Sequence, residues 1–278
     1  KTSPWKCRWK YWAAPGGNIG GGTGTNTLAQ LLLNGGTSEL VSASGAVSSS
    51  LVRFDAGSTL LVIGDLDVSR NPDADTNIVD FDNVDGGSLI LGGDLIGIAG
   101  QNVVQTSTDG TGRVTMASGA QQITGALGSE TAAIASLTIG SGAAPFNSAS
   151  QTTVDGDVFA DSVVLNTINS VESRLTMASG SSLTSTGGVT TSLPNDGFLT
   201  FAGGEQAMTG QVGSSGARLN LLTVASGSGS VTSFDSLVYS DLVESSEGTA
   251  NFEQSVFGTT LRVGSGSVNL DTVTATTS

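Results

Sequence analysis

RVTMASGAQQITGALGS at residues 113–129 recurs further along the chain as FLTFAGGEQAMTGQVGS at 198–214. In this alignment Gln121 matches Gln206, and Gly128 matches Gly213. The correspondence continues downstream, because SLTIGSG at 136–142 aligns with LLTVASG at 221–227. A long repeat is therefore present at least twice, and such self-similarity is typical of repeat architectures.

A shorter motif divides the long repeat: two apolar residues in alternation, followed by glycine. Most copies follow one another after about 23–25 residues, and two longer steps each contain another strand-like pattern. These patterns are GDVFADSVVL at 156–165 and FDSLVYSDLV at 234–243. The first residues of the motif are Leu89, Val114, Leu137, Leu175, Leu199, Leu222 and Leu261.

Two all-β folds can hold such a repeat, a β-solenoid or tandem β-sandwich domains. A sandwich has no reason to repeat one small motif within itself, and it usually has a bulky aromatic core. Here residues 13–278 contain no Trp, and Tyr239 is their one Tyr. We therefore predict a parallel β-helix-like solenoid with turns of about 20–25 residues and a super-repeat of about 85–86 residues. Tandem sandwiches are the alternative. The solenoid predicts that six motif leucines stack in register: Leu89, Leu137, Leu175, Leu199, Leu222 and Leu261.

The chain divides into three parts. Residues 1–14 form an amphipathic N-terminal strand, residues 15–37 a Gly-rich linker and possible cap, and residues 38–278 the repetitive body. Within the linker, NTLAQLLL at 26–33 fits either a short helix or a buried strand.

The N-terminal strand differs sharply in charge from the body. Its stretch WKCRWKYW holds all three tryptophans, and residues 1–12 carry a charge of +4 within a chain of net charge −14. Because side chains alternate along a strand, one side is aromatic and the other cationic. The aromatic side comprises Trp5, Cys7, Trp9 and Tyr11, and the cationic side Lys6, Arg8 and Lys10.

The repeats resemble those of bacterial cell-surface β-strand-repeat proteins, the filamentous-haemagglutinin-like and autotransporter-passenger-like sequences. The likeness is carried by GAQQITGALGS, SLTIGSG and GDVFADSVVL and covers about residues 38–278. It implies an extracellular or cell-surface rod that acts as an adhesin, stalk, fibre or surface layer. No run approaches the ~18 apolar residues of a membrane span.

The residue types exclude several catalytic classes. With no His and a single Cys, the chain cannot form a Ser-His-Asp or Cys-His arrangement. Carboxylates remain, and Asp65 with Asp67 and Asp80 with Asp82 are spaced for one strand face. We expect no enzyme activity, with a polysaccharide-active β-helix enzyme as the alternative. We also expect no nucleic-acid partner, because an acidic body repels phosphates.

The most acidic stretch is GDLDVSRNPDADTNIVDFDNVDGG at 64–87. The simpler interpretation is a solvated acidic loop inserted into one turn. The alternative is a calcium site formed by its oxygen-bearing side chains, although an EF-hand match fails because Ile78 and Val84 occupy its Gly and Glu positions. The candidate ligands are Asp73, Asp75, Asn77, Asp80, Asp82 and Asp85.

A row of threonines is expected along one outer face, where it forms either an ordinary β ladder or a packing face for a second rod. Its members are Thr115, Thr138, Thr176, Thr200 and Thr223.

The expected function is that of an exported structural subunit that polymerises head-to-tail. The C-terminal sequence SGSVNLDTVTATTS lacks a charged or helical cap, and an uncapped solenoid edge invites another chain. The N-terminal strand then docks on a neighbour or, alternatively, caps its own first turn. An adhesin-like rod with a glycan or host-surface ligand is the second expectation. The interface residues are Trp5, Lys6, Cys7, Arg8, Trp9, Lys10, Tyr11 and Trp12.

Overall fold

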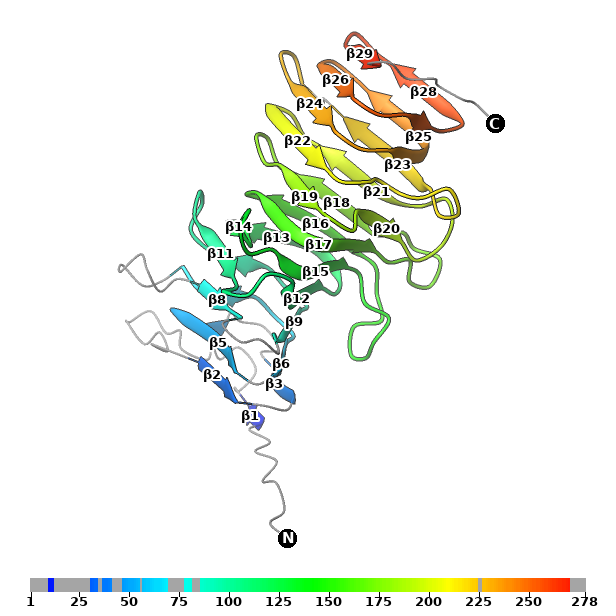
Figure 1. The fold of residues 1–278 in the computed structure, drawn as a ribbon. Helices are drawn as coiled ribbons and strands as arrows, with labels where there is room; N and C mark the ends of the chain where they lie inside the picture. Colours follow the sequence, from blue (N-terminus) through cyan, green and yellow to red (C-terminus); the bar gives the residue numbers. More distant parts are fainter. Residues whose placement is uncertain are drawn as a thin grey trace.

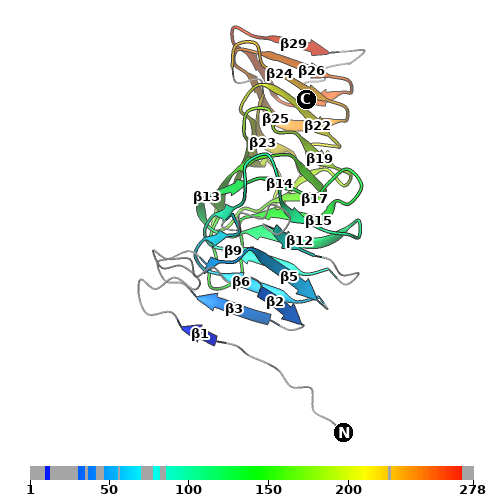
Figure 2. The ribbon, with the colours of Figure 1, turned by 90° about the vertical axis from the view of Figure 1, so that its left-hand side faces the viewer.

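The computed structural model describes residues 10–12, 31–34, 37–41, 47–55, 57–69, 78–81, 86–224 and 227–270. The described residues form strands, turns and bends, and no helix occurs among them. Figure 1 shows the strands stacked in sequence order, from the blue N-terminal part at the bottom to the red C-terminal part at the top. The view turned by 90° shows the same progression (Figure 2).

The strands form two sheets of 18 and 11 strands, in which the pairings follow three parallel series. The larger sheet contains the first and second series, and the smaller sheet contains the third. The first series comprises β1 (Lys10–Trp12), β3 (Thr37–Val41), β6 (Thr59–Val62), β9 (Ser88–Leu91), β12 (Thr111–Met116), β15 (Ile134–Ile139), β17 (Val158–Leu165) and β20 (Val189–Thr191).

The second series shares β17 with the first. It comprises β2 (Leu31–Asn34), β5 (Leu51–Asp55), β8 (Ile78–Asp80), β11 (Asn102–Gln105), β14 (Ala126–Leu127), β17, β19 (Leu183–Ser185), β22 (Glu205–Thr209), β24 (Val231–Phe234), β26 (Thr249–Phe252) and β29 (Ser267–Leu270).

The third series comprises β4 (Val47–Ser48), β7 (Leu66–Asp67), β10 (Leu95–Ile96), β13 (Gly119–Thr124), β16 (Ser150–Asp155), β18 (Arg174–Met177), β21 (Asp196–Phe201), β23 (Leu219–Val224), β25 (Val238–Ser245) and β28 (Thr260–Val263). Single bridges through Val212 continue the first series to β25, which also pairs with β27 (Val256–Phe257).

Every pairing between the described strands is parallel, for example between β9 and β12 and between β21 and β23. A tandem β-sandwich is built from antiparallel sheets, so the alternative fold is wrong. The all-β architecture with parallel strands in two sheets is consistent with a β-solenoid-like fold.

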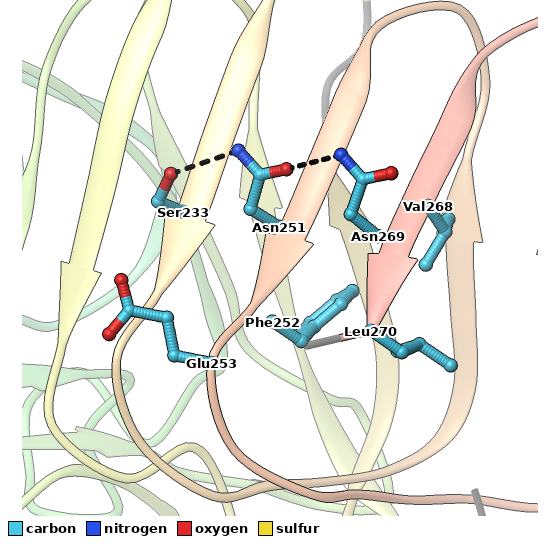
Figure 3. A pocket seen from close by; sticks show the side chains of 7 residues that line it. All are labelled: Ser233, Asn251, Phe252, Glu253, Val268, Asn269 and Leu270. Carbon is cyan, nitrogen blue, oxygen red and sulfur yellow. Dashed lines mark hydrogen bonds between the residues drawn. The ribbon is translucent and has the colours of Figure 1, made fainter. Parts of the chain in front are cut away.

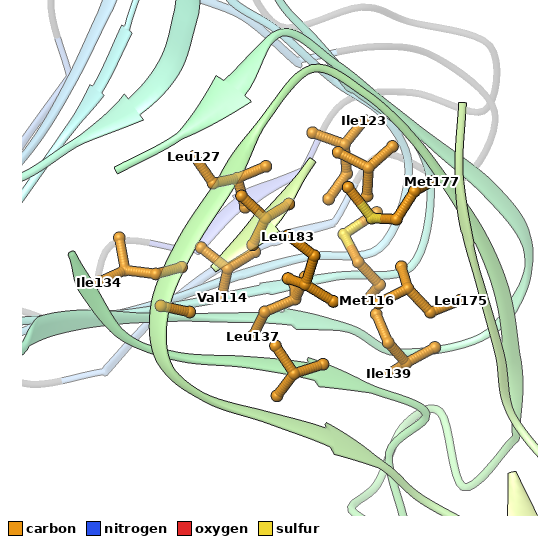
Figure 4. Packing of buried hydrophobic residues seen from close by; sticks show 14 of the residues in the cluster. Val114, Met116, Ile123, Leu127, Ile134, Leu137, Ile139, Leu175, Met177 and Leu183 are labelled. Atoms are coloured by element: carbon orange, nitrogen blue, oxygen red, sulfur yellow. The ribbon is translucent and has the colours of Figure 1, made fainter. Parts of the chain in front are cut away.

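The core lies between the three series of strands. It is built from the side chains that face inward as successive residues of each strand alternate between the two sides. β12 buries Val114 and Met116 at alternate positions, and β15 buries Leu137 and Ile139 in the same way. Figure 4 shows Val114 and Leu137 from these strands near Leu183, in a buried cluster that also contains Met177 of the smaller sheet. Val114, Leu137, Met177 and Leu183 are all fully buried.

The motif leucines stack in two columns, which corrects the expected single column. In the first series Leu89 pairs with Val114, and Val114 pairs with Leu137. In the third series the column is Leu175, Leu199, Leu222, Val243 and Leu261. One sequence motif therefore serves two different sheets.

The threonine row is divided in the same way. Thr115 pairs with Thr138 in the larger sheet, whereas Thr176, Thr200 and Thr223 form a separate row in the smaller sheet. The single continuous face that the sequence suggested is therefore wrong, and both rows are short β ladders.

The stretch 26–33 enters the sheet as a strand where it is described. Leu31, Leu32 and Leu33 lie in β2, and β2 pairs with β5. Leu33 is buried, and Leu31 packs against the core. This part of the predicted linker is thus a strand of the body. The described residues contain no long apolar helix of the kind that crosses a membrane.

Candidate functional site

The predicted interface segment is described only at its C-terminal end. Lys10, Tyr11 and Trp12 form β1, which pairs in parallel with β3 of the same chain. Tyr11 lies in register with Leu40, and Leu40 with the buried Val62. These backbone pairings favour the self-capping alternative for β1. The remaining interface residues lie outside the described part of the chain: Trp5, Lys6, Cys7, Arg8 and Trp9.

At the other end, β28 and β29 leave core positions exposed. Leu261 is 42% exposed, whereas Val243, its register partner in β25, is 1% exposed. In the second series, the ring of Phe252 stacks on Phe234 with 4.8 Å between the centroids. The next residue in that column is Leu270, which is only partly buried. Apolar positions that earlier strands cover are therefore accessible here within the described residues.

A groove of about 580 Å³ lies beside this exposed edge. Its apolar floor is formed by the partly buried Val268 and Leu270, beside the buried ring of Phe252 (Figure 3). Ladder hydrogen bonds border it: Asn269 Nδ2 donates to Asn251 Oδ1 at 2.8 Å, and Asn251 Nδ2 donates to Ser233 Oγ at 3.4 Å. The carboxylate of the exposed Glu253 also lines the groove. An apolar floor with a polar rim and one carboxylate suits a mixed aromatic and cationic segment.

Asp80 is the one predicted calcium ligand whose placement is described. It lies in β8, is 7% exposed, and its Oδ2 lies 3.9 Å from Arg53 Nε. A solvated loop is therefore the wrong environment for Asp80, which belongs to the sheet. The other predicted ligands lie outside the described residues: Asp73, Asp75, Asn77, Asp82 and Asp85. Across the residues that the structure describes, no three acidic, His or Cys side chains gather around a potential metal site.

The calcium site remains a prediction with a direct test. If calcium binds the folded chain, the melting temperature rises with calcium and falls with a chelator, by linkage of binding to folding. Magnesium should have a smaller effect, because it needs a stricter octahedral geometry. The double variant Asp73→Asn/Asp75→Asn should lose the calcium-dependent shift. A shift that persists in this variant would place the ion elsewhere, and no shift at all would contradict the site.

Several described acids act as acceptors between neighbouring strands. Asp65 Oδ1 accepts from the Asp94 amide at 2.9 Å, and Asp94 Oδ1 accepts from the Gln122 amide at 2.8 Å. Asp157 accepts from the Ser182 amide in the same way. Of the paired acids that suggested catalysis, Asp65 makes this bridge and Asp67 Oδ1 accepts from Ser69, whereas Asp82, the partner of Asp80, lies outside the described residues. The bridging carboxylates tie successive strands together.

The repeated glutamines bind the corners of the fold. Gln121 and Gln206 are each 5% exposed. Gln121 Nε2 donates to the carbonyl oxygens of Leu91 and Gly93, at 3.1 and 2.6 Å. Gln206 Nε2 likewise donates to backbone carbonyl oxygens, those of Ala178 and Ser181 at 2.8 and 2.9 Å and that of Met177 at 3.5 Å. The two glutamines match each other in the sequence repeat, but only the structure shows that they donate hydrogen bonds to backbone carbonyl oxygens.

A carboxyl pair lies near a corner of the smaller sheet. Asn220 Nδ2 donates to Glu172 Oε1 at 2.7 Å, and Thr167 Oγ1 donates to Asp196. Burial raises the pKa of Glu172 above its usual value. The charge and hydrogen bonding of Asp196 raise this pKa further, whereas the Asn220 hydrogen bond and Arg174 lower it. Because the raised pKa favours the protonated acid, ionisation of Glu172 weakens this corner.

Replacement of Glu172 by Gln should therefore stabilise the protein at neutral pH. Glu172 contributes most below the unfolded pKa of about 4.3, and its contribution is lost as the pH rises through the raised folded value. We expect Glu172→Gln to raise the melting temperature by about 1–2 °C at pH 8 and to have little effect at pH 4. Glu205→Gln, at an exposed position of β22, is the control. Equal shifts at both pH values would refute the role of ionisation.

Comparison with known proteins assigns no family. No protein-family profile matches the chain, and no curated protein or solved structure matches it significantly. The class is therefore given by the fold alone, an all-β chain of parallel strands in two sheets.

Proposed function

We propose that the chain is a β-solenoid whose turns each take one strand from the first, third and second series, in that order. The spacing of paired residues supports this, because Val114 pairs with Leu137 and Phe234 pairs with Phe252. Each partner thus lies one short turn further along the chain. The super-repeat then spans three complete turns plus the step from one series of strands to the next. Val114 lies in the larger sheet, and its repeat equivalent Leu199 lies in the smaller one.

We further propose that this solenoid is a structural subunit that assembles head-to-tail into an extracellular fibre, sheath or surface layer. The exposure of core positions at β28 and β29 carries this proposal, above all that of Leu261 and Val263, at 42% and 43%. Covering such apolar area on a neighbour favours the joint, because it removes apolar surface from water.

The parallel pairing gives the assembly its direction. In a stack of parallel strands, the two edges offer complementary backbone donors and acceptors, so the last strands of one copy match the first strands of the next. A head-to-tail contact whose rotation does not close on itself produces open filaments, and the proposed joint is of this kind. The resemblance to bacterial cell-surface repeat proteins supports the extracellular location.

The N-terminal segment strengthens the joint in this proposal. Residues 1–12 carry +4, and the remainder of the chain carries −18. Opposite charges steer two copies together, and aromatic side chains supply contact area. β1 caps its own first turn, and the residues before it reach the neighbour.

A binding rod is the second candidate, favoured by two apolar side chains in neighbouring loops. Val171 is 58% exposed and Leu193 is 52% exposed. Exposed apolar side chains on a rigid scaffold are typical of ligand-binding loops. A chain that stays monomeric while binding a glycan or a surface receptor would favour this function over the fibre.

Deletion of residues 1–14 tests the assembly. We expect the variant to retain its β circular dichroism spectrum but to lose at least about tenfold in assembly affinity, equivalent to about 1.4 kcal/mol. High salt should weaken the intact chain only partly, because screening removes the charge attraction and leaves the aromatic contacts. Sedimentation velocity measures both effects. A deletion variant that polymerises like the parent would show that the segment serves only as a cap for its own chain.

A further inference from the structure

We infer that the groove beside β29 receives the N-terminal segment of a second copy, with residues 5–9 in the groove and Lys10–Trp12 still paired with β3 of their own copy. This inference rests on the proposed head-to-tail assembly and adds the surface that receives the segment. Figure 3 shows the groove with Phe252, Val268 and Leu270 at its apolar side and Asn251 and Asn269 along its border.

The shape of the groove fits a short extended segment. Its volume of about 580 Å³ lies within the range of about 300–1,000 Å³ that holds compact ligands. Five extended residues cover roughly 17 Å, comparable with the length of a short strand such as β29, which has 4 residues. Among the described residues β29 pairs with β26 alone, so its second edge accepts an added strand.

The chemistry of the two surfaces is complementary. Trp5, Cys7 and Trp9 alternate with Lys6 and Arg8, so an extended segment presents an aromatic side and a cationic side. The aromatic side fits the apolar floor of the groove.

The polar border of the groove matches the cationic side. The carboxylate of Glu253 and the amide of Asn269 line that border, and both residues are exposed. They offer oxygen acceptors to Lys6 and Arg8. The aromatic side of the segment thus meets the apolar floor, and its cationic side meets the polar border. A purely apolar edge would offer no acceptors to the cationic side.

The single cysteine of the chain allows a covalent test in the full-length protein. Cys7 lies on the aromatic side of the segment, and Leu270→Cys places a partner on the apolar floor of the groove. A disulfide forms only when the two Cα atoms come within about 7 Å. Under mild oxidation we expect more than half of the Leu270→Cys protein to run as a ladder of oligomers, which reducing agent or Cys7→Ser removes. Val268→Cys, also on the apolar floor, should give the same ladder and serves as the second variant.

Matched controls separate this contact from its alternatives. Ser215→Cys, at an exposed loop position, should give at least about tenfold less ladder, and an equal yield would overturn the inference. Leu31→Cys reports self-capping, because Leu31 lies on β2 and packs against the core. A cross-linked monomer from Leu31→Cys with no ladder from Leu270→Cys would place the segment on its own chain. A ladder that requires removal of residues 271–278 would assign the groove to that segment instead.

Sedimentation of the unmodified chain distinguishes the proposed head-to-tail assembly from the proposed contact in the groove. Polymers without a ladder from either groove cysteine would reject the groove and leave the head-to-tail assembly standing. Monomers without a ladder would reject both.

Discussion

Leu199→Asp is expected to unfold the protein or to destabilise it by at least about 4 kcal/mol, a large part of a typical total of about 5–15 kcal/mol. Leu199 is fully buried in β21, between Leu175 and Leu222 of the same column. A carboxylate at this position loses its hydration, and the column supplies no cation in return. Urea unfolding followed by circular dichroism measures the effect.

Two further variants keep this prediction testable if Leu199→Asp does not fold. Leu199→Ala should cost about 2–5 kcal/mol, the usual range for a large side chain removed from a packed core. Leu193→Asp makes the same chemical change at a residue that is 52% exposed, and it should cost no more than about 0.5 kcal/mol. Equal losses at positions 199 and 193 would show that the column is not the core.

Gln121→Glu should cost about 3 kcal/mol or more at neutral pH, although the two side chains have nearly the same shape. The carboxylate cannot donate to the carbonyl oxygens of Leu91 and Gly93, and it places a buried charge against them. Part of the loss should be recovered as the pH falls, because a protonated Glu donates one hydrogen bond. Thermal unfolding between pH 4 and pH 8 measures the loss and its recovery.

The adjacent residue supplies the control. Gln122 lies on the same strand but is exposed, so Gln122→Glu should change stability by no more than about 0.5 kcal/mol at either pH. If the two variants lost equal stability, the buried amide would have no special role. If the loss at position 121 did not depend on pH, missing donation would not be its cause.

The sequence predicted the all-β class because the alternation and the short repeat both appear in local patterns. It did not predict which sheet each copy of the motif joins. One super-repeat leads from Val114 to Leu199, whereas three steps along the first series lead from Val114 only to Val189. The residues after Val189 carry the chain onto the smaller sheet, so the equal motifs fall on different sheets.

Local sequence patterns were also insufficient to predict how the residues of the candidate sites are arranged. Acid-rich spacing suggested ligands and catalytic pairs, but the described acids, such as Asp65 and Asp94, bridge to backbone amides of neighbouring strands. Those amides belong to strands that are distant in the sequence, and local spacing does not identify them. The groove likewise depends on Phe252 and Leu270, which meet only because β26 pairs with β29. By contrast, the amphipathic character of residues 5–12 is local and was visible in the sequence.

Electron microscopy of the full-length chain tests head-to-tail assembly most directly. The second series contains eleven strands, β2 to β29, and at about 4.8 Å per strand it predicts a subunit length on the order of 50 Å. The account predicts unbranched filaments with strands perpendicular to the long axis and an axial subunit repeat of that length. Separate rods of about 50 Å that remain monodisperse at every protein concentration would contradict it.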